Sequence, residues 1–456
     1  MENKITIEET LLSLVELKKF GTIKEILVTM NSVDIAVLFN ELPVQSLPKL
    51  FRLLPKELAA ETFVEMDSDL QELLIIGFSD RELKEVINEL YVDDAVDIVE
   101  EMPANVVGRI LKQASPDMRK EINELLKYPE DSAGSVMTTE FVNLKSDLTV
   151  EQAILQIHKT GLDKETVNTC YITRPDKVLI GSVTLRALII ANPRDIVADI
   201  METNVISVTT DIDKENVALT FSKYDLIAVP VVDAENRLVG IVTVDDALDV
   251  MQDEATEDIE KMAAILPTDK TYFKTSIFET VKARIPWLLL LMISATFTGM
   301  IITTFENKLT LFPALISFIP MLMDTAGNSG SQSSVTIIRG ISLGDIEFKD
   351  IYKVIWKEIR VALICGAILS IINFIKIWLI DIQLLRGTAN IKDDIIVCLT
   401  LMITVIIAKI VGCTLPLLAH KIKLDPAVMA SPFITTIVDA IALLFYFGLA
   451  SLILGI

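Results

Sequence analysis

Five apolar segments in the C-terminal part of the chain constrain its fold more than any other feature. They cover residues 285–304, 309–338, 361–380, 395–418 and 427–454. Most reach the length of about 20 residues that a helix needs to cross the hydrocarbon layer of a membrane. The second is apolar only in its first half, so its polar second half must face protein or water rather than lipid. We therefore expect a transmembrane domain with five spans over residues 281–456.

Lys and Arg side chains flank these segments unevenly, and the excess lies in alternate loops. Because positive charges are enriched in cytoplasmic loops, we expect a cytoplasmic N-terminus and an external C-terminus. The predicted location is the cell inner (plasma) membrane, as a multi-pass protein surrounded by lipid. Lys409 lies inside the fourth segment, and we expect its ammonium group to snorkel to the inner headgroups.

The charge is divided unequally along the chain. Residues 274–456 contain 15 Lys and Arg against 12 Asp and Glu, so the net charge of −22 leaves −25 for residues 1–273. A half with this charge is repelled by phosphate backbones, which excludes nucleic acid as a natural partner. The cytoplasmic half is instead expected to attract cations.

Polar side chains recur at steps of four residues in two apolar segments, which places each set on one helical face. The sets are Asp324, Asn328, Gln332 and Thr336 in the second segment, and Ser431, Thr435 and Asp439 in the fifth. Hydrogen bonding between helices explains Ser333 or Ser431. It explains the two carboxylates poorly, because an acid in hydrocarbon needs a cation, a proton or water. We interpret the two stripes as the lining of an ion pathway.

The stripes offer oxygen ligands and no sulfur, which favours a hard divalent cation. Mg²⁺ sheds its water reluctantly, so it suits a pore in which one carboxylate per subunit holds a hydrated ion. A symmetric homodimer would double that charge and place the pore between protomers. The expected function is a Mg²⁺-selective channel or transporter.

Catalysis is not expected, so the chain is predicted not to be an enzyme. Its two histidines, His158 and His420, are far apart in sequence, and no GxxxxGK[ST] motif is present. Three alternatives remain open. They are a chloride channel, which would need an anion-attracting pore, an intramembrane protease using Asp324 and Asp439, and a sensor that does not transport.

The cytoplasmic half has two kinds of pattern. Residues 1–130 contain short helical segments separated by Pro, Gly or Asp, which predicts an acidic helical superhelix. Residues 131–256 contain a strand–helix–strand–strand–helix order twice. This order and the motif VPVVDAENRLVGIVTVDDAL resemble a tandem CBS domain pair. The fold class is therefore a multidomain membrane protein: an all-α superhelical domain, an α/β CBS pair, a connecting helix over 257–280 and five spans.

Four motifs together resemble the MgtE family of magnesium channels. They are YPEDSAGSVMT, DEATEDIEKM, IPMLMDTAGNSGSQSS and LDPAVMASPFITTIVDA. The resemblance covers essentially the whole chain. It implies a homodimer whose second and fifth spans form the pore, with Asp439 holding the hydrated ion and Asn328 lining the path near the gate.

The resemblance also implies that cytoplasmic Mg²⁺ binds acidic surfaces and closes the pore, so that Mg²⁺ is both substrate and regulator. The matching positions are Glu61, Asp93, Asp97, Asp213, Glu215, Asp225, Asp246, Glu254, Glu257, Asp258 and Asp425. Nucleotide-binding CBS modules use a Ser/Thr-x-x-Asp turn. The second module has Thr243 and Asp246, but the first has Thr184 followed three residues later by Ala187, which makes ATP doubtful as a cofactor.

Overall fold

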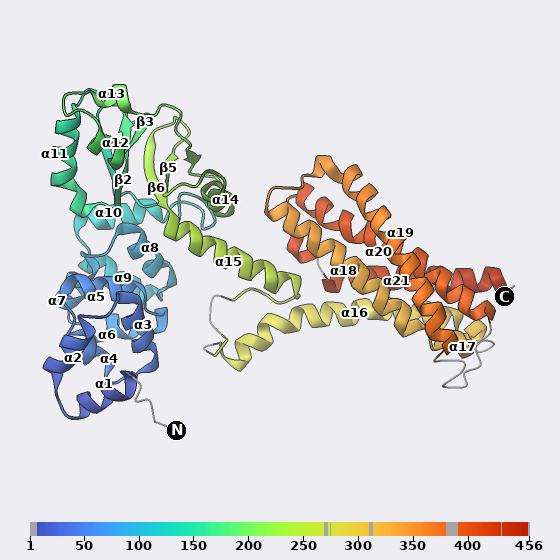
Figure 1. Cartoon of the computed structure of the whole chain (residues 1–456). Coiled ribbons are helices and arrows are strands. Elements are labelled where there is room, and N and C mark those ends of the chain that lie inside the picture. Colours follow the sequence, from blue (N-terminus) through green and yellow to red (C-terminus); the bar gives the residue numbers. More distant parts are fainter. Residues whose placement is uncertain are drawn as a thin grey trace. The chain divides into compact units, whose positions relative to one another are not determined.

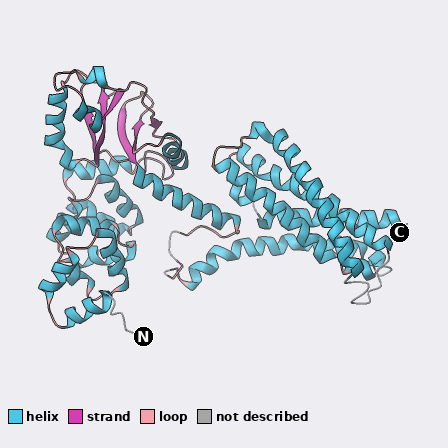
Figure 2. Cartoon of the chain, viewed as in Figure 1, coloured by secondary structure: helices cyan, strands magenta, loops and turns pink. Residues whose placement is uncertain are grey.

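The computed structural model describes residues 7–268, 272–273, 275–309, 313–379, 391–429 and 431–454. The chain divides into two compact units, Met1–Met251 and Gln252–Ile456, which are described separately (Figure 1). Strands occur only in the first unit, and the rest of the described chain is helix and connecting loop (Figure 2).

The first part of unit 1 is a succession of short helices, as the sequence pattern predicts. They are α1 (Ile7–Glu16), α2 (Phe20–Leu27), α3 (Ser32–Glu41), α4 (Leu47–Phe51), α5 (Lys56–Val64), α6 (Ser68–Gly77), α7 (Asp80–Ile87), α8 (Val92–Glu101), α9 (Ala104–Gln113) and α10 (Pro116–Leu125). Local signals set several starts. A capping box between Ser79 and Glu82 begins α7, and the Ser115 hydroxyl accepts the Met118 amide hydrogen at the start of α10.

The rest of unit 1 contains the duplicated fold that the sequence predicts. The first copy has β1 (Phe141–Leu144), α11 (Val150–Thr160), η1 (Gly161–Asp163), β2 (Thr166–Thr173), β3 (Leu179–Thr184) and α12 (Leu185–Ile190). After α13 (Val197–Ile200), the second has β4 (Val208–Thr209), α14 (Lys214–Tyr224), β5 (Ala228–Val232), β6 (Leu238–Thr243) and α15 (Val244–Met262). In each sheet the first pair of strands is parallel and the second is antiparallel. The repeated strand order confirms the internal duplication.

Unit 2 is helical. After the end of α15 it contains α16 (Ile277–Leu309), α17 (Pro313–Ile316), α18 (Ile319–Ser342), η2 (Phe348–Asp350), α19 (Ile351–Lys376), α20 (Ile391–Lys421), η4 (Pro426–Met429) and α21 (Ser431–Leu454). Of residues 257–280, expected as a connecting helix, 257–262 end α15 and 277–280 begin α16, and residues 269–271 and 274 lie outside the described residues.

Four helical segments in the described part of the chain are long and apolar enough to cross a membrane. They are Ile277–Phe305, Phe348–Leu379, Ile391–Lys421 and Pro426–Leu454. Helix α18 is not among them, although its 24 residues give a length of about 36 Å. Its polar residues make it less apolar than the other four, as expected for the second predicted segment. A multidomain membrane protein is confirmed, and the count of five spans stays a prediction.

Small residues let α18 pack tightly against its neighbours. Ala326, Gly327, Ser329, Gly330 and Ser333 are all buried on one side of the helix. A Cβ atom on Gly412 of α20 would overlap the carbonyl oxygen of Gly330, so the two backbones are in direct contact there. A Cβ on Gly327 would lie 2.9 Å from Cγ2 of Thr435 on α21. Helix α18 is therefore held between α20 and α21.

Candidate functional site: a helical polar face and two acidic clusters

The predicted stripe on α18 forms one face of that helix. Asp324, Asn328, Gln332 and Thr336 are all exposed, whereas the small residues on the opposite face are buried. The Thr336 hydroxyl donates a hydrogen bond to the carbonyl oxygen of Gln332 within the helix. Lipid cannot solvate carboxylate and amide groups, so this face must meet water or another protein surface in a membrane. We define these four residues as the α18 polar face.

The predicted stripe on α21 lies beside α18. Thr435 contacts α18 at Gly327, and its hydroxyl donates to the carbonyl oxygen of Pro432 at 2.9 Å. Asp439, one turn further along α21, is half-buried and close enough to Asp324 to interact electrostatically. Its Oδ1 is buried and has no hydrogen-bond partner among the described residues. The side chain of Ser431 lies outside the described residues. The structure thus brings Asp439, Thr435 and Asp324 together from two helices.

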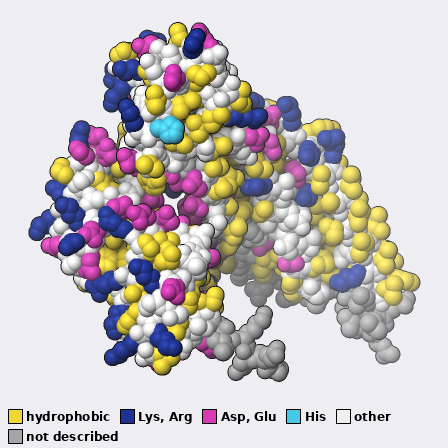
Figure 3. All heavy atoms as spheres, turned by 60° about the vertical axis from the view of Figure 1, so that its left-hand side comes forward, with side chains coloured by type: hydrophobic (Ala, Val, Ile, Leu, Met, Phe, Trp, Pro, Cys, Tyr) yellow, Lys and Arg dark blue, Asp and Glu magenta, His cyan; other side chains and the backbone are white. Residues whose placement is uncertain are grey.

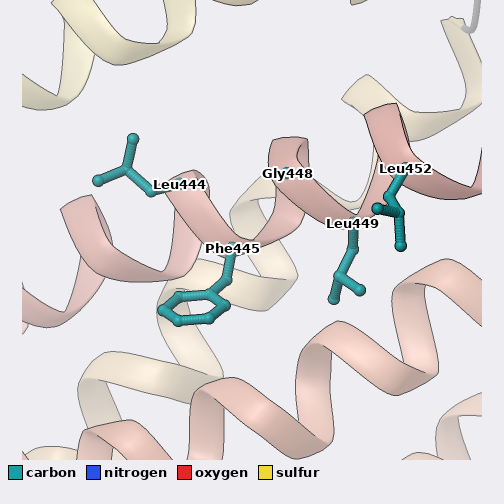
Figure 4. Close-up of a pocket in the computed structure, with 5 residues that line it drawn as sticks. All are labelled: Leu444, Phe445, Gly448, Leu449 and Leu452. Carbon is teal, nitrogen blue, oxygen red and sulfur yellow. The ribbon is translucent and has the colours of Figure 1, made fainter. Parts of the chain in front are cut away.

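An apolar hollow lies elsewhere along α21. Leu444, Phe445, Leu449 and Leu452 project from this helix around Gly448 (Figure 4). None of these five residues carries a polar side-chain atom, and a hydrated cation needs oxygen ligands. The hollow therefore offers no ligand to a hydrated cation.

Lys409 does not snorkel, and that prediction was wrong. The residue is only 6% exposed, and its Nζ lies 3.8 Å from Oε2 of Glu358 on α19. The same Nζ donates to Oγ of Ser333 at 3.2 Å, and that hydroxyl donates to Glu358 at 2.6 Å. The hydrogen bonding between helices expected of Ser333 is confirmed. A buried ammonium is stabilised by a nearby carboxylate, so it has no need to reach the headgroups.

The expected third apolar segment begins at residue 361, so it leaves out Glu358. The helix in fact extends from Ile351, which places Glu358 inside it. The signal that could have identified this residue was Lys409 itself. A lysine in an apolar segment needs a counter-ion, and the acids in neighbouring segments are few.

In unit 1, acidic side chains from several elements gather around α8. We define the α8 cluster as five carboxylates that influence one another electrostatically: Asp93, Asp94 and Asp97 on α8, Glu165 before β2 and Asp246 in the first turn of α15. Figure 3 shows Asp and Glu side chains gathered across the middle of this unit. None of the five forms an ion pair with Lys or Arg within the described part of the chain.

Burial and mutual repulsion both make the charged forms of this cluster unfavourable. Burial is the larger cause, and it raises the pKa of Asp93 to about 6, of Asp97 and Asp246 to about 7, and of Asp94 and Glu165 to about 8. Oδ1 of Asp93 and Oε2 of Glu165 have no hydrogen-bond partner among the described residues. Buried, unpartnered carboxylate oxygens fit the chemistry of a hard cation such as Mg²⁺.

The structure brings three of the predicted sensor residues, Asp93, Asp97 and Asp246, into the α8 cluster. Sequence analysis missed Asp94 and Glu165. Glu61, Asp213 and Asp225 are exposed, and Glu215 is half-buried on α14. The Asp213 carboxylate caps α14 by accepting the Glu215 amide hydrogen at 2.9 Å. These four residues are therefore not part of the buried cluster.

A second acidic group joins α15 to the loop before η4 in unit 2. The Lys261 ammonium lies 2.5 Å from Oε1 of Glu257 and 2.6 Å from Oδ2 of Asp425. Ser342, at the end of α18, donates to Oδ2 of Asp258 at 3.3 Å. Glu254, one turn before Asp258, is half-buried. We define Glu257, Asp258 and Asp425 as the α15 cluster.

Lys261 supplies the positive charge of the α15 cluster. Although burial lowers the pKa of this ammonium, its hydrogen bonds to Asp425 and Glu257 outweigh that effect and raise the pKa to about 12. Burial also raises the pKa of Asp258, and Asp425 raises it further. The three carboxylates of the cluster outnumber the single ammonium of Lys261. A further cation would neutralise the negative charge that remains.

The nucleotide candidates Thr243 and Asp246 overlap the α8 cluster, because Asp246 belongs to both. Oγ1 of Thr243 donates to Oδ2 of Asp246 at 2.5 Å, and Thr243 is buried. The Thr-x-x-Asp turn is therefore closed by its own hydrogen bond.

Within the described ranges, no group of three or more His, Cys, Asp or Glu side chains converges closely enough to hold a metal ion.

Family models match three parts of the chain. Residues 319–449 match a divalent cation transporter, residues 30–131 match the MgtE intracellular N domain, and residues 197–253 match the CBS domain. The magnesium transporter MgtE of Bacillus subtilis is 33% identical over 99% of both chains. The magnesium transporter MgtE of Thermus thermophilus is 35% identical over 95% of both chains.

Two solved structures resemble about half of this chain. One is the cytosolic domain of the Mg²⁺ channel MgtE in complex with ATP, with a TM-score of 0.50 and 36% identity over 52% of this chain and 99% of that one. The other is the soluble part of a magnesium transporter, with a TM-score of 0.51 and 30% identity over 54% and 98%. With near-complete coverage of relatives above 30% identity, this chain belongs to the MgtE family of divalent cation transporters.

Proposed function

We propose that this protein is a Mg²⁺-selective channel or transporter for magnesium uptake that closes when cytoplasmic Mg²⁺ is high. The observation that carries the proposal is the α18 polar face beside Asp439. Carboxylate, amide and hydroxyl oxygens line the adjacent helices α18 and α21, and Oδ1 of Asp439 has no hydrogen-bond partner among the described residues. The water molecules bound to a hydrated Mg²⁺ ion can donate hydrogen bonds to these oxygens, so the ion binds without losing its water shell.

The α18 polar face also supports a homodimer. Asp324, Asn328 and Gln332 are exposed in the single chain, and lipid is a poor environment for them. A second copy related by two-fold symmetry would cover this face and place two Asp439 carboxylates around one path. In this proposal the pore lies between protomers. With a cytoplasmic N-terminus, the membrane potential favours inward movement by about 4.6 kcal/mol per 100 mV for two charges, so no ATP motor is needed.

The gating part of the proposal rests on the two acidic clusters. Residues 1–130, 131–256 and 257–280 would form the sensor, and residues 281–456 the pore. At low Mg²⁺, repulsion between the carboxylates of each cluster would move the parts of the sensor away from each other. Mg²⁺ bound at the α8 and α15 clusters would compact them and close the pore, because the ion binds the compact state more tightly. Glu61, Asp213, Glu215 and Asp225 would bind the ion only when brought to facing acids by this rearrangement or by the partner protomer.

ATP is not proposed as a cofactor of this chain. A relative's cytosolic domain was solved with ATP. In this chain, however, the negative charges of Asp93 and Asp245 act on Asp246. The Thr243 hydroxyl is already hydrogen-bonded to the Asp246 carboxylate. A triphosphate placed beside these carboxylates would be repelled.

The proposed function can be tested directly. The full chain is reconstituted in liposomes that hold a Mg²⁺-sensitive dye, and Mg²⁺ influx is measured under an inside-negative potential. Current is then recorded in patches while Mg²⁺ on the cytoplasmic face is varied. We expect inward Mg²⁺ current that falls as cytoplasmic Mg²⁺ rises. Chloride flux, peptide cleavage without ion flux, or the absence of flux would each favour one of the alternatives over this proposal.

The α8 cluster predicts an unusual pH dependence of stability. Its carboxylates have raised pKa values in the folded state, so the folded chain binds more protons than the unfolded chain between about pH 4 and pH 8. The free energy of unfolding should therefore fall as the pH rises through this window, by at least about 3 kcal/mol between pH 5.5 and pH 8, which is the contribution of one carboxyl group with a pKa raised to about 8. Millimolar Mg²⁺ should restore the lost stability at pH 8.

The measurement is thermal unfolding of residues 1–262, which contain the first compact unit, with and without Mg²⁺. Neutralising two members by Asp94→Asn and Asp97→Asn should flatten both the pH dependence and the Mg²⁺ effect. Asp211→Asn, at an exposed site outside the cluster, serves as the control. A stability independent of pH in this window would contradict the prediction.

Lys261 should tune the response to cytoplasmic Mg²⁺. Its ammonium occupies the space between Glu257 and Asp425 that a regulatory cation would share. Lys261→Met should therefore lower the Mg²⁺ concentration that halves the current by about three- to tenfold, and raise the current at zero Mg²⁺. Lys261→Arg should behave as wild type. Lys120→Met, which removes only an exposed pair with Glu124, is the control. An unchanged Mg²⁺ response in Lys261→Met would show that the ammonium does not compete with the ion.

A further inference from the structure

Three transmembrane-unit helices meet at a single hydroxyl group. Ser333 of α18 donates to Oε2 of Glu358 on α19 at 2.6 Å, and Lys409 of α20 donates to the same hydroxyl at 3.2 Å. All three residues are buried, with exposed fractions of 2%, 9% and 6%. We call Ser333, Glu358 and Lys409 the polar triad.

Stability alone does not account for this triad. A buried ion pair is often no more stabilising than well-packed apolar side chains of similar volume, because both charges lose their hydration. An apolar contact, however, does not fix the rotation of a helix about its own axis, whereas a hydrogen bond has a required direction. The property that the triad adds is therefore orientation.

The helix that needs orientation is α18. On one side it presents Asn328 and Gln332, and on the other it packs small residues against α20 and α21. Gly330 and Gly412 bring the backbones of α18 and α20 into contact, and neither has a side chain that could resist rotation. Ser333 lies one turn from Gly330, and Lys409 lies one turn from Gly412. The hydrogen bonds of the triad thus act next to the crossing point.

We propose that the polar triad positions α18 so that Asn328 and Gln332 face the ion pathway, and that Ser333, Glu358 and Lys409 are positioning residues for conduction. This inference rests on the proposed transport function. The triad neutralises its own charges, so Glu358 and Lys409 act on the pathway through the orientation of α18. Loss of the Ser333 hydroxyl turns the polar face away from the pathway without removing any group that contacts the ion.

The decisive variant is Ser333→Ala, because it removes one hydroxyl and leaves Glu358 and Lys409 able to pair. Ser329→Ala is the matched control, since it removes a buried hydroxyl from the same face of α18 one turn earlier. The full chain is reconstituted in liposomes for Mg²⁺ influx. We expect Ser333→Ala to lower the influx about tenfold while the protein still unfolds in one cooperative transition, at a somewhat lower temperature because hydrogen bonds to charged groups are lost. Ser329→Ala should conduct as wild type.

A second readout reports orientation without requiring transport. Gln332→Cys is introduced into a chain whose four cysteines are replaced by alanine, and its reaction with a membrane-impermeant methanethiosulfonate is timed. Adding Ser333→Ala should lower the reaction rate about tenfold, because it turns position 332 away from the pathway. If wild-type protein shows no Mg²⁺ influx, the proposed function fails, and this rate still decides whether the triad orients α18.

A third variant separates orientation from stability and from charge. The double variant Glu358→Leu with Lys409→Met removes both charges together and should unfold near the wild-type temperature. We expect it to conduct as poorly as Ser333→Ala and to show the same altered rate at position 332. Wild-type influx in the double variant, or an unchanged modification rate in Ser333→Ala, would overturn the proposal.

Discussion

Replacing Asp439 by alanine or asparagine is expected to lower Mg²⁺ flux at least about 100-fold. A carboxylate near a hydrated ion is worth about 3 kcal/mol per unit charge of the ion at an effective dielectric of 20. In the proposed two-fold pore, two such carboxylates are lost at once. Asparagine keeps the size and one oxygen, so a loss in both variants assigns the effect to charge. The folded chain should persist, because Oδ1 of Asp439 has no hydrogen-bond partner among the described residues to lose.

The measurement is Mg²⁺ current in patches with each variant beside wild type. Thr436→Val is the control on the same helix, because the Thr436 hydroxyl bonds only the Pro432 carbonyl of its own helix among the hydrogen bonds described. Asp324→Asn should cause a smaller loss, since Asp324 is more exposed than Asp439. If Asp439→Ala and Asp439→Asn conduct like wild type, Asp439 is not the selectivity group and the transport proposal loses its main support.

Local patterns predicted much of the architecture. The two CBS modules were identified from one strand and helix order that occurs twice, and the structure has two sheets with the same order. The α18 polar face was predicted from a four-residue step, because that spacing alone places side chains on one helical face. The same four-residue step placed Thr435 and Asp439 on one face of α21. These features depend on sequence neighbours, so sequence was sufficient for them.

Contacts between distant segments could not be predicted in this way. Nothing in the spacing of Ser333, Glu358 and Lys409 shows that three helices meet at one hydroxyl. Glu165 joins the α8 cluster only because the CBS module packs against the helical domain within unit 1. The sequence around Lys261 does not show that its ammonium pairs with Asp425, which lies far away in the chain. In each case the missing information is which surfaces meet, which depends on packing over the whole unit.

The contact between Gly330 and Gly412 gives the second large expected effect. Gly412→Ala places a methyl group onto the Gly330 carbonyl oxygen, and the neighbouring carbon atoms of Gly330 lie 3.0 and 3.1 Å from it. These are backbone atoms, so no rotamer change relieves the overlap. Helix α18 must move as a whole. We expect a loss of about 3 kcal/mol in the free energy of unfolding and at least about a tenfold loss of Mg²⁺ flux.

Gly448→Ala is the matched control for this prediction. Gly448 is also a glycine inside a membrane helix, but a Cβ there meets no atom within 4 Å, and alanine favours helix more than glycine does. It should leave the unfolding temperature and the flux unchanged or slightly higher. Wild-type unfolding and flux in Gly412→Ala would mean that α18 can leave α20 without consequence. Because α18 presents Asp324, Asn328 and Gln332, that outcome would also separate the polar face from the ion pathway.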